Sequence, residues 1–258
     1  MIWYNIPPSK FDIIDIHGHY GRFNLFNAPH SEADSLINTM DRIGIRQLCI
    51  APFLSIKLDC IEGNRMTYEA MRKYPNRILG HACVNPFDET ETMEQLTMCF
   101  EQWGFHAIKL HPDFNGIESE SSRYRAVFEY ANAHNLTILW HYGATARYLE
   151  KIASDFKNVN FVVAHYGGSW DGYRTDDVLN VVRNIENVYT DTASSVAWYG
   201  AFERLIDYVG ADKVLFGSDF LFLDAAFQLG RIIGADIEQK EKEKALGGNF
   251  KRLLAMKT

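Results

Sequence analysis

Two histidines at the end of an apolar segment are the first residues whose types and spacing could do chemistry. His17 and His19 close a segment that begins at Phe11, within the stretch Asp-Ile-His-Gly-His. If the segment is a β-strand, both imidazoles point to the same side, because residues i and i+2 of a strand share a face. Two neutral imidazoles so placed form half of a metal-binding shell. A His-x-His pair alone is common, so this interpretation depends on the rest of the chain.

Further residues that can bind a metal or move a proton stand at the ends of later apolar segments. They are cationic, imidazole or carboxylate side chains, namely Lys109, His111, His141, His165 and Asp219. Imidazole and carboxylate ligands suit Zn²⁺, with Mn²⁺ and Fe²⁺ as alternatives. A metal ion in such a shell lowers the pKa of bound water and polarises a carbonyl group. The residue types therefore favour a metal-dependent enzyme, and the other four histidines are interpreted as structural.

The segments that carry these residues alternate with helical patterns along the whole chain. Strands are predicted at 11–20, 46–52, 77–86, 105–112, 136–143, 160–168, 187–193 and 213–219. Helices are predicted at 31–43, 59–73, 89–103, 122–134, 146–155, 175–185 and 201–209, with one more at 237–256 that is broken or kinked near its two glycines. Strict alternation indicates a parallel sheet, and eight units in about 250 residues fit a closed α/β barrel, the (β/α)8 or TIM barrel.

No linker or low-complexity segment divides the chain, so a single domain is predicted over residues 1–258, with a C-terminal helical extension. In such a barrel the carboxyl ends of the strands meet at one mouth, where catalytic side chains gather. The histidines, Lys109 and Asp219 are therefore expected to converge. The loop at 21–31 is longer than an ordinary turn and is expected to overhang the site.

Composition and charge exclude several classes of function. The net charge is −7, and no cluster of Lys and Arg suggests binding to nucleic acid. Four cysteines without C-x-x-C spacing suit reduced thiols in a cytoplasmic protein. No apolar run is long enough for a membrane span, and the first ten residues lack the apolar core of a signal peptide. If the chain oligomerises, a homodimer is the commonest arrangement.

Five motifs make the chain similar to a known family. They are DIHGH at 15–19, IKLHP at 108–112, WHYG at 140–143, AHYGG at 164–168 and FGSD at 216–219. Together and in this order they resemble the amidohydrolase superfamily, in particular the amidohydrolase 2 branch of metal-dependent TIM-barrel hydrolases and non-oxidative decarboxylases. The resemblance implies that His17, His19, His141 and Asp219 hold a divalent metal. It also implies that His165 lies beside the metal-bound water or ligates a second metal.

The remaining roles follow from the resemblance together with side-chain chemistry. Asp219 can accept a proton from the attacking water and later deliver it to the leaving group, while His165 orients that water or stabilises the oxyanion. Lys109 is expected to stay a cation that meets an acidic group of the substrate, with one metal bound. Binuclear relatives carry a carboxylated lysine at this address, so two metals are expected if Lys109 is carboxylated. His111 is expected to line the pocket and Arg147 to contact a substrate carboxylate.

The favoured function is hydrolysis of an amide, lactone or ester bond in a small, carboxylated molecule. The alternative is non-oxidative decarboxylation of an aromatic or enoic acid. The chain lacks the insertions associated with decarboxylase-like members, which favours hydrolysis. A non-catalytic binding protein is disfavoured because every expected ligand type is present. Tyr142, Trp170 and Trp198 are candidates for the pocket walls, and the substrate itself depends on loop shapes that one sequence does not determine.

Overall fold

Eight parallel strands form the centre of the computed structural model, which describes residues 10–25, 27–28, 30–141, 144–168, 176–195 and 198–256. They lie side by side in chain order: β1 (Ile13–Tyr20), β2 (Ile45–Pro52), β3 (Ile78–Cys83), β4 (Ala107–Leu110), β5 (Thr137–Trp140), β6 (Asn160–Val163), β7 (Val188–Asp191) and β8 (Val214–Leu215). The sheet closes where Ile16 N–H donates to the Phe216 carbonyl, at 2.9 Å, and Asp219 N–H donates to the His17 carbonyl, at 2.8 Å. The predicted (β/α)8 barrel is confirmed.

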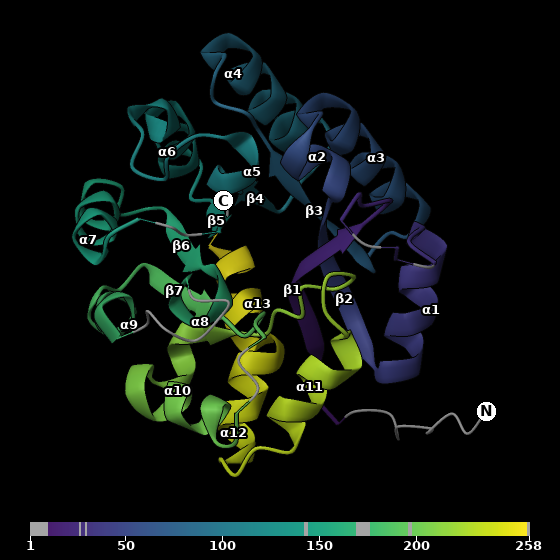
Figure 1. Ribbon diagram of the computed structural model, residues 1–258, viewed down its shortest axis with the longest axis vertical. Coiled ribbons are helices and arrows are strands. Elements are labelled where there is room, and N and C mark those ends of the chain that lie inside the picture. The colour runs from purple at the N-terminus through teal and green to yellow at the C-terminus, as the bar shows by residue number, and fades with distance from the viewer. Residues whose placement is uncertain are drawn as a thin grey trace.

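Helices surround the strands on all sides (Figure 1). They are α1 (Ala33–Ile43), α2 (Phe53–Lys57), α3 (Cys60–Lys73), α4 (Glu89–Thr97), α5 (Pro112–Asn115), α6 (Arg125–Ala133), α7 (Ala146–Asp155), α9 (Asp176–Asn184), α10 (Ala201–Val209), α11 (Ala225–Ile233), α12 (Gln239–Glu243) and α13 (Asn249–Ala255). The predicted helices recur with shifted ends, whereas α2, α5 and α11 were not predicted. Because α2 and α5 span only five and four residues, they are too short to show a helical repeat of apolar residues.

The barrel interior is filled by one apolar cluster below the predicted site. Its members come from the strands, the residue that follows β6 and the last helix: Ile14, Ile16, Cys49, Leu79, Leu139, Val162, Ala164, Tyr189, Leu215, Phe250 and Leu253. Phe250 and Leu253 belong to α13, which crosses the ring of strands in Figure 1. Asn249 at the start of α13 donates to the carbonyls of Ala211 and Val214, at the amino end of β8. The C-terminal helix therefore covers the amino-terminal end of the barrel and leaves the other end open.

β1 contains an irregularity that decides where its side chains point. Asp15 pairs with Leu48 of β2, whereas Gly18 pairs with Ile50. Three residue steps on β1 thus face two steps on β2, which is the arrangement of a β-bulge. One extra residue reverses the face on which every later side chain lies.

The reversal puts the two histidines inside the barrel. Ile14 and Ile16, before the bulge, belong to the inner cluster. His17 and His19, after it, line the inner cavity. A Cβ on Gly18 would lie 2.6 Å from a Leu48 methyl carbon on the outer side, so any larger residue would displace the Leu48 side chain. The prediction that the two imidazoles share a side is confirmed, and the bulge makes it the inner side.

Two observations bear on the expectations from composition. All four cysteines are buried and unbridged, as expected of reduced core thiols. Among the residues that the structure describes, no helix is both long and apolar enough to cross a membrane.

Candidate metal centre

A cavity of about 260 Å³ opens at the carboxyl ends of the strands. Its lining includes the residues with metal-binding or proton-transfer chemistry, namely His17, His19, Lys109, His111, His141, His165 and Asp219. The structure thus brings together the metal ligands, proton-transfer residues and substrate-binding residues expected from the sequence, apart from Arg147. Lys109 is placed by the simple alternation of side chains along β4. Ile108 and Leu110 face the outer core, so Lys109 between them faces the cavity.

Three ligand atoms converge at the centre of the cavity floor. Asp219 Oδ1 lies 3.1 Å from His19 Nε2 and 3.4 Å from His17 Nε2. Ligands about 2.1 Å from a tetrahedral metal ion are about 3.4 Å from one another. The three side chains are buried, and their donors are the imidazole nitrogens and carboxylate oxygen that Zn²⁺ and Mn²⁺ accept. The donor set therefore fits a divalent cation.

The protonation states of the site also suit a cation. Burial alone would raise the pKa of Asp219, but the hydrogen bond with His19 and nearby positive charge lower it to about 2. Burial lowers the pKa of His17 well below its usual value and lowers that of His165 to about 3. The carboxylate is thus ionised and these two imidazoles are neutral at pH 7, which is the state that binds metal.

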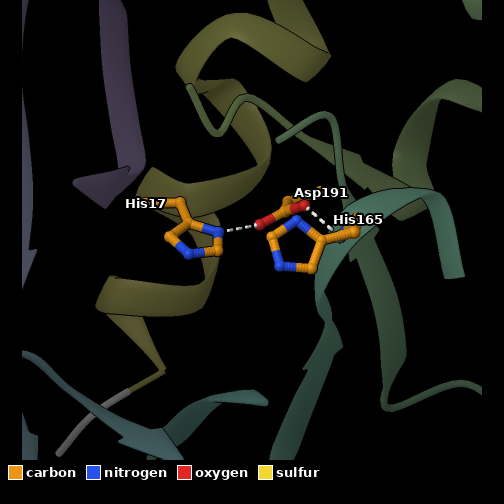
Figure 2. Close-up of side chains that lie close together, drawn as sticks. All are labelled: His17, His165 and Asp191. Carbon is orange, nitrogen blue, oxygen red and sulfur yellow. Dashed lines mark hydrogen bonds and ion pairs between the residues drawn. The ribbon is translucent and has the colours of Figure 1, made fainter. Parts of the chain in front are cut away.

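Asp191, at the end of β7, is a site residue that sequence reasoning missed. Its Oδ2 lies 2.7 Å from His17 Nδ1, and its Oδ1 accepts from the backbone N–H of His165 at 2.7 Å (Figure 2). Burial raises the pKa of Asp191, while the hydrogen bond from the His165 amide lowers it. The available signal was its position, since it ends a barrel strand as the other site residues do. The predicted strand ran on to Ala193 and so concealed this end.

Lys109 lies deep in the cavity floor. Its side chain is fully buried, and its Nζ lies 2.7 Å from His17 Nε2. Burial lowers the pKa of Lys109 to about 8, and the charges of Asp219 and Asp191 act in the opposite direction. The amine is therefore within reach of any group bound between the histidines.

His165 follows β6 in a turn rather than in the predicted strand at 160–168. β6 ends at Val163, and residues 164–168, labelled α8 in Figure 1, include His165, Tyr166 and Gly167 at positive φ angles of 62°, 54° and 91°. The left-handed conformation is costly for His165 and Tyr166 because both carry a Cβ. Two acceptors on β7 hold the turn, since Asp191 Oδ1 binds the His165 amide and Thr190 Oγ1 binds the Gly167 amide. The strand prediction was wrong here because these long-range bonds outweigh local preference.

His141 lies between two groups of side chains. Its Nδ1 is 2.9 Å from His165 Nε2, and its Nε2 is 3.4 Å from an oxygen of Asp113. Its ring stacks on His111 at a centroid distance of 3.9 Å. His141 thus lines the cavity but, within the described part of the chain, groups with His111 and Asp113 rather than with Asp219.

Two further residues expected at the site lie elsewhere. Arg147 is exposed on α7 and does not line the cavity. Trp198 is also exposed and away from the lining. Tyr142 and Trp170 fall outside the described residues.

One wall of the cavity is aromatic. Phe53 stacks on the ring of His19 at 5.1 Å, and Phe114 stacks on His111 at 4.0 Å. Phe23, from the loop after β1, stacks on Phe53 at 4.4 Å and so reaches the mouth as expected of that loop. α2 and α5, the short helices that the sequence did not reveal, carry Phe53 and Phe114. Such a wall suits a flat, apolar part of a ligand beside the polar floor.

Comparisons with known proteins place this geometry in a family. The family model described as amidohydrolase matches residues 14–255. Similar folds include a 2,6-dihydroxybenzoate decarboxylase from Rhizobium, with a TM-score of 0.74, 15% identity, and 96% of this chain and 100% of that chain covered. A 4-oxalomesaconate hydratase from Rhodopseudomonas palustris has a TM-score of 0.72 and 18% identity, with 95% of this chain and 96% of that chain covered. A dihydroxybenzoic acid decarboxylase from Polaromonas was solved with manganese and an inhibitor. It has a TM-score of 0.72 and 14% identity, with 96% of this chain and 98% of that chain covered. No curated protein matches the chain.

Proposed function

The chain belongs to the amidohydrolase family, as its sequence motifs suggested, and we propose that it is a metal-dependent hydrolase of a small carboxylated molecule. The bond cleaved would be an amide, a lactone or an ester. The convergence of His17, His19 and Asp219 at hydrogen-bond distances on the floor of one cavity carries this proposal.

We propose that His17, His19 and Asp219 hold one metal ion, with His141 as the fourth ligand. Zinc suits the donor set, and manganese is the alternative, since a decarboxylase of similar fold was solved with manganese bound. A divalent ion in this position would polarise a carbonyl group and lower the pKa of water. A second ion would need a carboxylated Lys109 as a further ligand.

The protein's own groups would then handle the proton and the substrate charge. Asp219 is ionised at neutral pH and so can accept a proton from water. Because its pKa is low, the protonated acid would readily pass that proton to the leaving group. His165, whose Nε2 faces the cavity, would orient the water, and Lys109 would bind a carboxylate of the substrate.

The aromatic wall favours a second candidate function. Phe53, Phe114 and Phe222 would accommodate an aromatic acid, and two proteins of similar fold are decarboxylases of dihydroxybenzoic acids. In a non-oxidative decarboxylase Asp219 or His165 would take a proton from water and deliver it to the carbon that loses CO₂. The same side chains thus serve either reaction.

One experiment separates the two functions. Protein stripped with a chelator and reloaded with zinc or manganese is assayed against amides, lactones and esters of small carboxylic acids, with CO₂ release measured on the parent aromatic and enoic acids. Hydrolysis supports the first function, and CO₂ release supports the second. In either case Asp219→Asn should lower kcat/KM by at least about 100-fold. Asp207→Asn, at an exposed position on α10, is the matched control. Full turnover by the chelated protein would contradict metal dependence.

A further inference from the structure

Two imidazoles on the cavity floor, those of His19 and His165, share one pattern of hydrogen bonding. His19 Nδ1 lies 2.9 Å from the Ala51 carbonyl, and His165 Nδ1 pairs with the Ala193 carbonyl. A carbonyl oxygen only accepts, so the Nδ1 of each of these two rings carries a hydrogen. His17 differs, because its Nδ1 pairs with the carboxylate of Asp191 instead of a backbone carbonyl. Its tautomer therefore depends on one replaceable side chain.

The two oxygens of Asp191 have separate partners. Oδ1 accepts from the backbone N–H groups of His165 and Ala193, at 2.7 and 3.1 Å. Oδ2 pairs with His17 Nδ1 at 2.7 Å (Figure 2). Asp191 is wholly buried, so no bulk water competes for either oxygen. One carboxyl group thereby links the ring of His17 on β1 to the backbone of His165 after β6.

We propose that Asp191 is a positioning residue that holds the ring hydrogen of His17 on Nδ1 and so directs the Nε2 lone pair toward the metal site. The proposal rests on the proposed function only in naming the metal, because the tautomer is a property of the chain itself. His17 Nε2 faces Lys109 Nζ at 2.7 Å and Asp219 Oδ1 at 3.4 Å, on the side of the ring away from Asp191. A neutral imidazole can ligate through Nε2 only if Nδ1 carries the hydrogen and finds an acceptor there.

A direct metal-binding role for Asp191 is the alternative, because His17, His165 and Asp191 also form a compact group of potential ligands. The bonding pattern argues against it. Both oxygens of Asp191 are engaged, and the nitrogen of His17 that faces Asp191 is Nδ1 rather than Nε2. A metal bound by Asp191 would have to displace three hydrogen bonds.

The test is Asp191→Asn, which conserves shape but changes one acceptor into a donor. Because the two amide N–H groups at the Oδ1 position need an acceptor, the asparagine oxygen must take that place and its NH₂ group must face His17 Nδ1. The ring hydrogen of His17 should then move to Nε2. We expect the ¹⁵N spectrum of histidine-labelled, chelated protein to show this change for His17, assigned with His17→Gln. His19, whose acceptor is unchanged, is the internal control.

Metal binding supplies the second readout. The affinity of the asparagine variant for Zn²⁺ or Mn²⁺, measured by titration calorimetry, should fall about 10- to 100-fold, while its melting temperature in chelator stays close to that of the wild type. An unchanged tautomer or an unchanged affinity would overturn the proposal. If the variant does not fold, the wild-type spectrum decides, since a hydrogen on His17 Nε2 also overturns it. If the wild type binds no metal, the proposed function fails, whereas the tautomer shift still tests Asp191.

Discussion

Gly217 is the residue that allows side chains of β1 and β7 to meet beneath the cavity. A Cβ at this position would lie 2.9 Å from Asp191 Oδ2 and 2.9 Å from the Cβ of His17. Both neighbours are buried and hydrogen-bonded to each other, so neither can move aside freely. The glycine of the FGSD motif is therefore required by packing as much as by any turn.

Replacing Gly217 by alanine should separate the His17–Asp191 pair. We expect the free energy of unfolding to fall by about 1–3 kcal/mol, as for other overpacked sites, and the metal affinity to fall about 10-fold or more. Chemical denaturation in chelator and calorimetric titration with Zn²⁺ measure the two effects. Gly230→Ala on α11 is the control, because its Cβ would meet no atom within 4 Å. Equal metal affinities for the two variants would contradict the packing argument.

At the scale of elements, the seam between β1 and β8 depends on a buried carboxylate. β8 contains only two residues, so few regular strand bonds are available to close the barrel. Asp15 on β1 accepts from the backbone N–H groups of His17 and Ser218, each at 3.0 Å, and from the Ser218 hydroxyl. Burial raises the pKa of Asp15 to about 7 despite these bonds. The Asp15 carboxylate therefore depends on all three of these hydrogen-bond donors.

Ser218→Ala should destabilise the seam by removing one donor from a carboxyl group that no water can reach. The expected loss in free energy of unfolding is about 1–3 kcal/mol, measured by urea denaturation. Ser154→Ala offers a comparison, since the Ser154 hydroxyl is exposed on α7 and donates to the Glu150 carbonyl one turn earlier. A loss no larger than that of the comparison variant would refute the role assigned to Ser218.

At the scale of the whole molecule, the barrel has one open end and one covered end. α13 places Phe250 and Leu253 in the inner cluster. Gly247, two residues before α13, lies so close to the backbone before β1 that a Cβ would be 2.2 Å from the Asp12 carbonyl oxygen. The covered end supports the floor on which the candidate metal ligands lie. Truncating a side chain on α13 should therefore affect the stability of the entire barrel.

Leu253→Ala should cost about 2–5 kcal/mol of unfolding free energy, because it leaves a cavity in the inner cluster. Leu254→Ala on the same helix is the matched control, since Leu254 is only partly buried against that cluster. Both values come from chemical denaturation. Similar losses for the two variants would mean that α13 does not insert into the barrel.

Buried neutral histidines should make the fold sensitive to acid. Burial lowers the pKa of His81 to about 3, against an ordinary value of 6.5. Between pH 6.5 and 3 the unfolded chain binds more protons than the folded chain at this residue, so stability is present above pH 6.5 and is lost as pH falls. His81→Gln should reduce this loss by about 1.4 kcal/mol per pH unit between pH 6 and 5. Chemical denaturation of the wild type and the variant in chelator, at pH 6 and at pH 5, measures the free energies of unfolding. An equal loss of stability in the two proteins would contradict the role assigned to His81.

The sequence by itself determined the alternation of strands and helices, and with it the barrel. The positions of the strand ends also placed His17, His19, Lys109 and Asp219 at one mouth, because in a parallel barrel the carboxyl ends of all strands meet there. The reduced, buried cysteines followed from composition in the same way.

Tertiary structure alone decided the features that depend on contacts between distant segments. The bulge in β1 exists only in register with β2, and it turns His17 and His19 inward. The turn at His165 is held by Asp191, 26 residues further along the chain. Asp191 also meets His17 across 174 residues of sequence. Local patterns carry no information about such pairings, because their energies come from barrel closure and burial rather than from neighbouring residues.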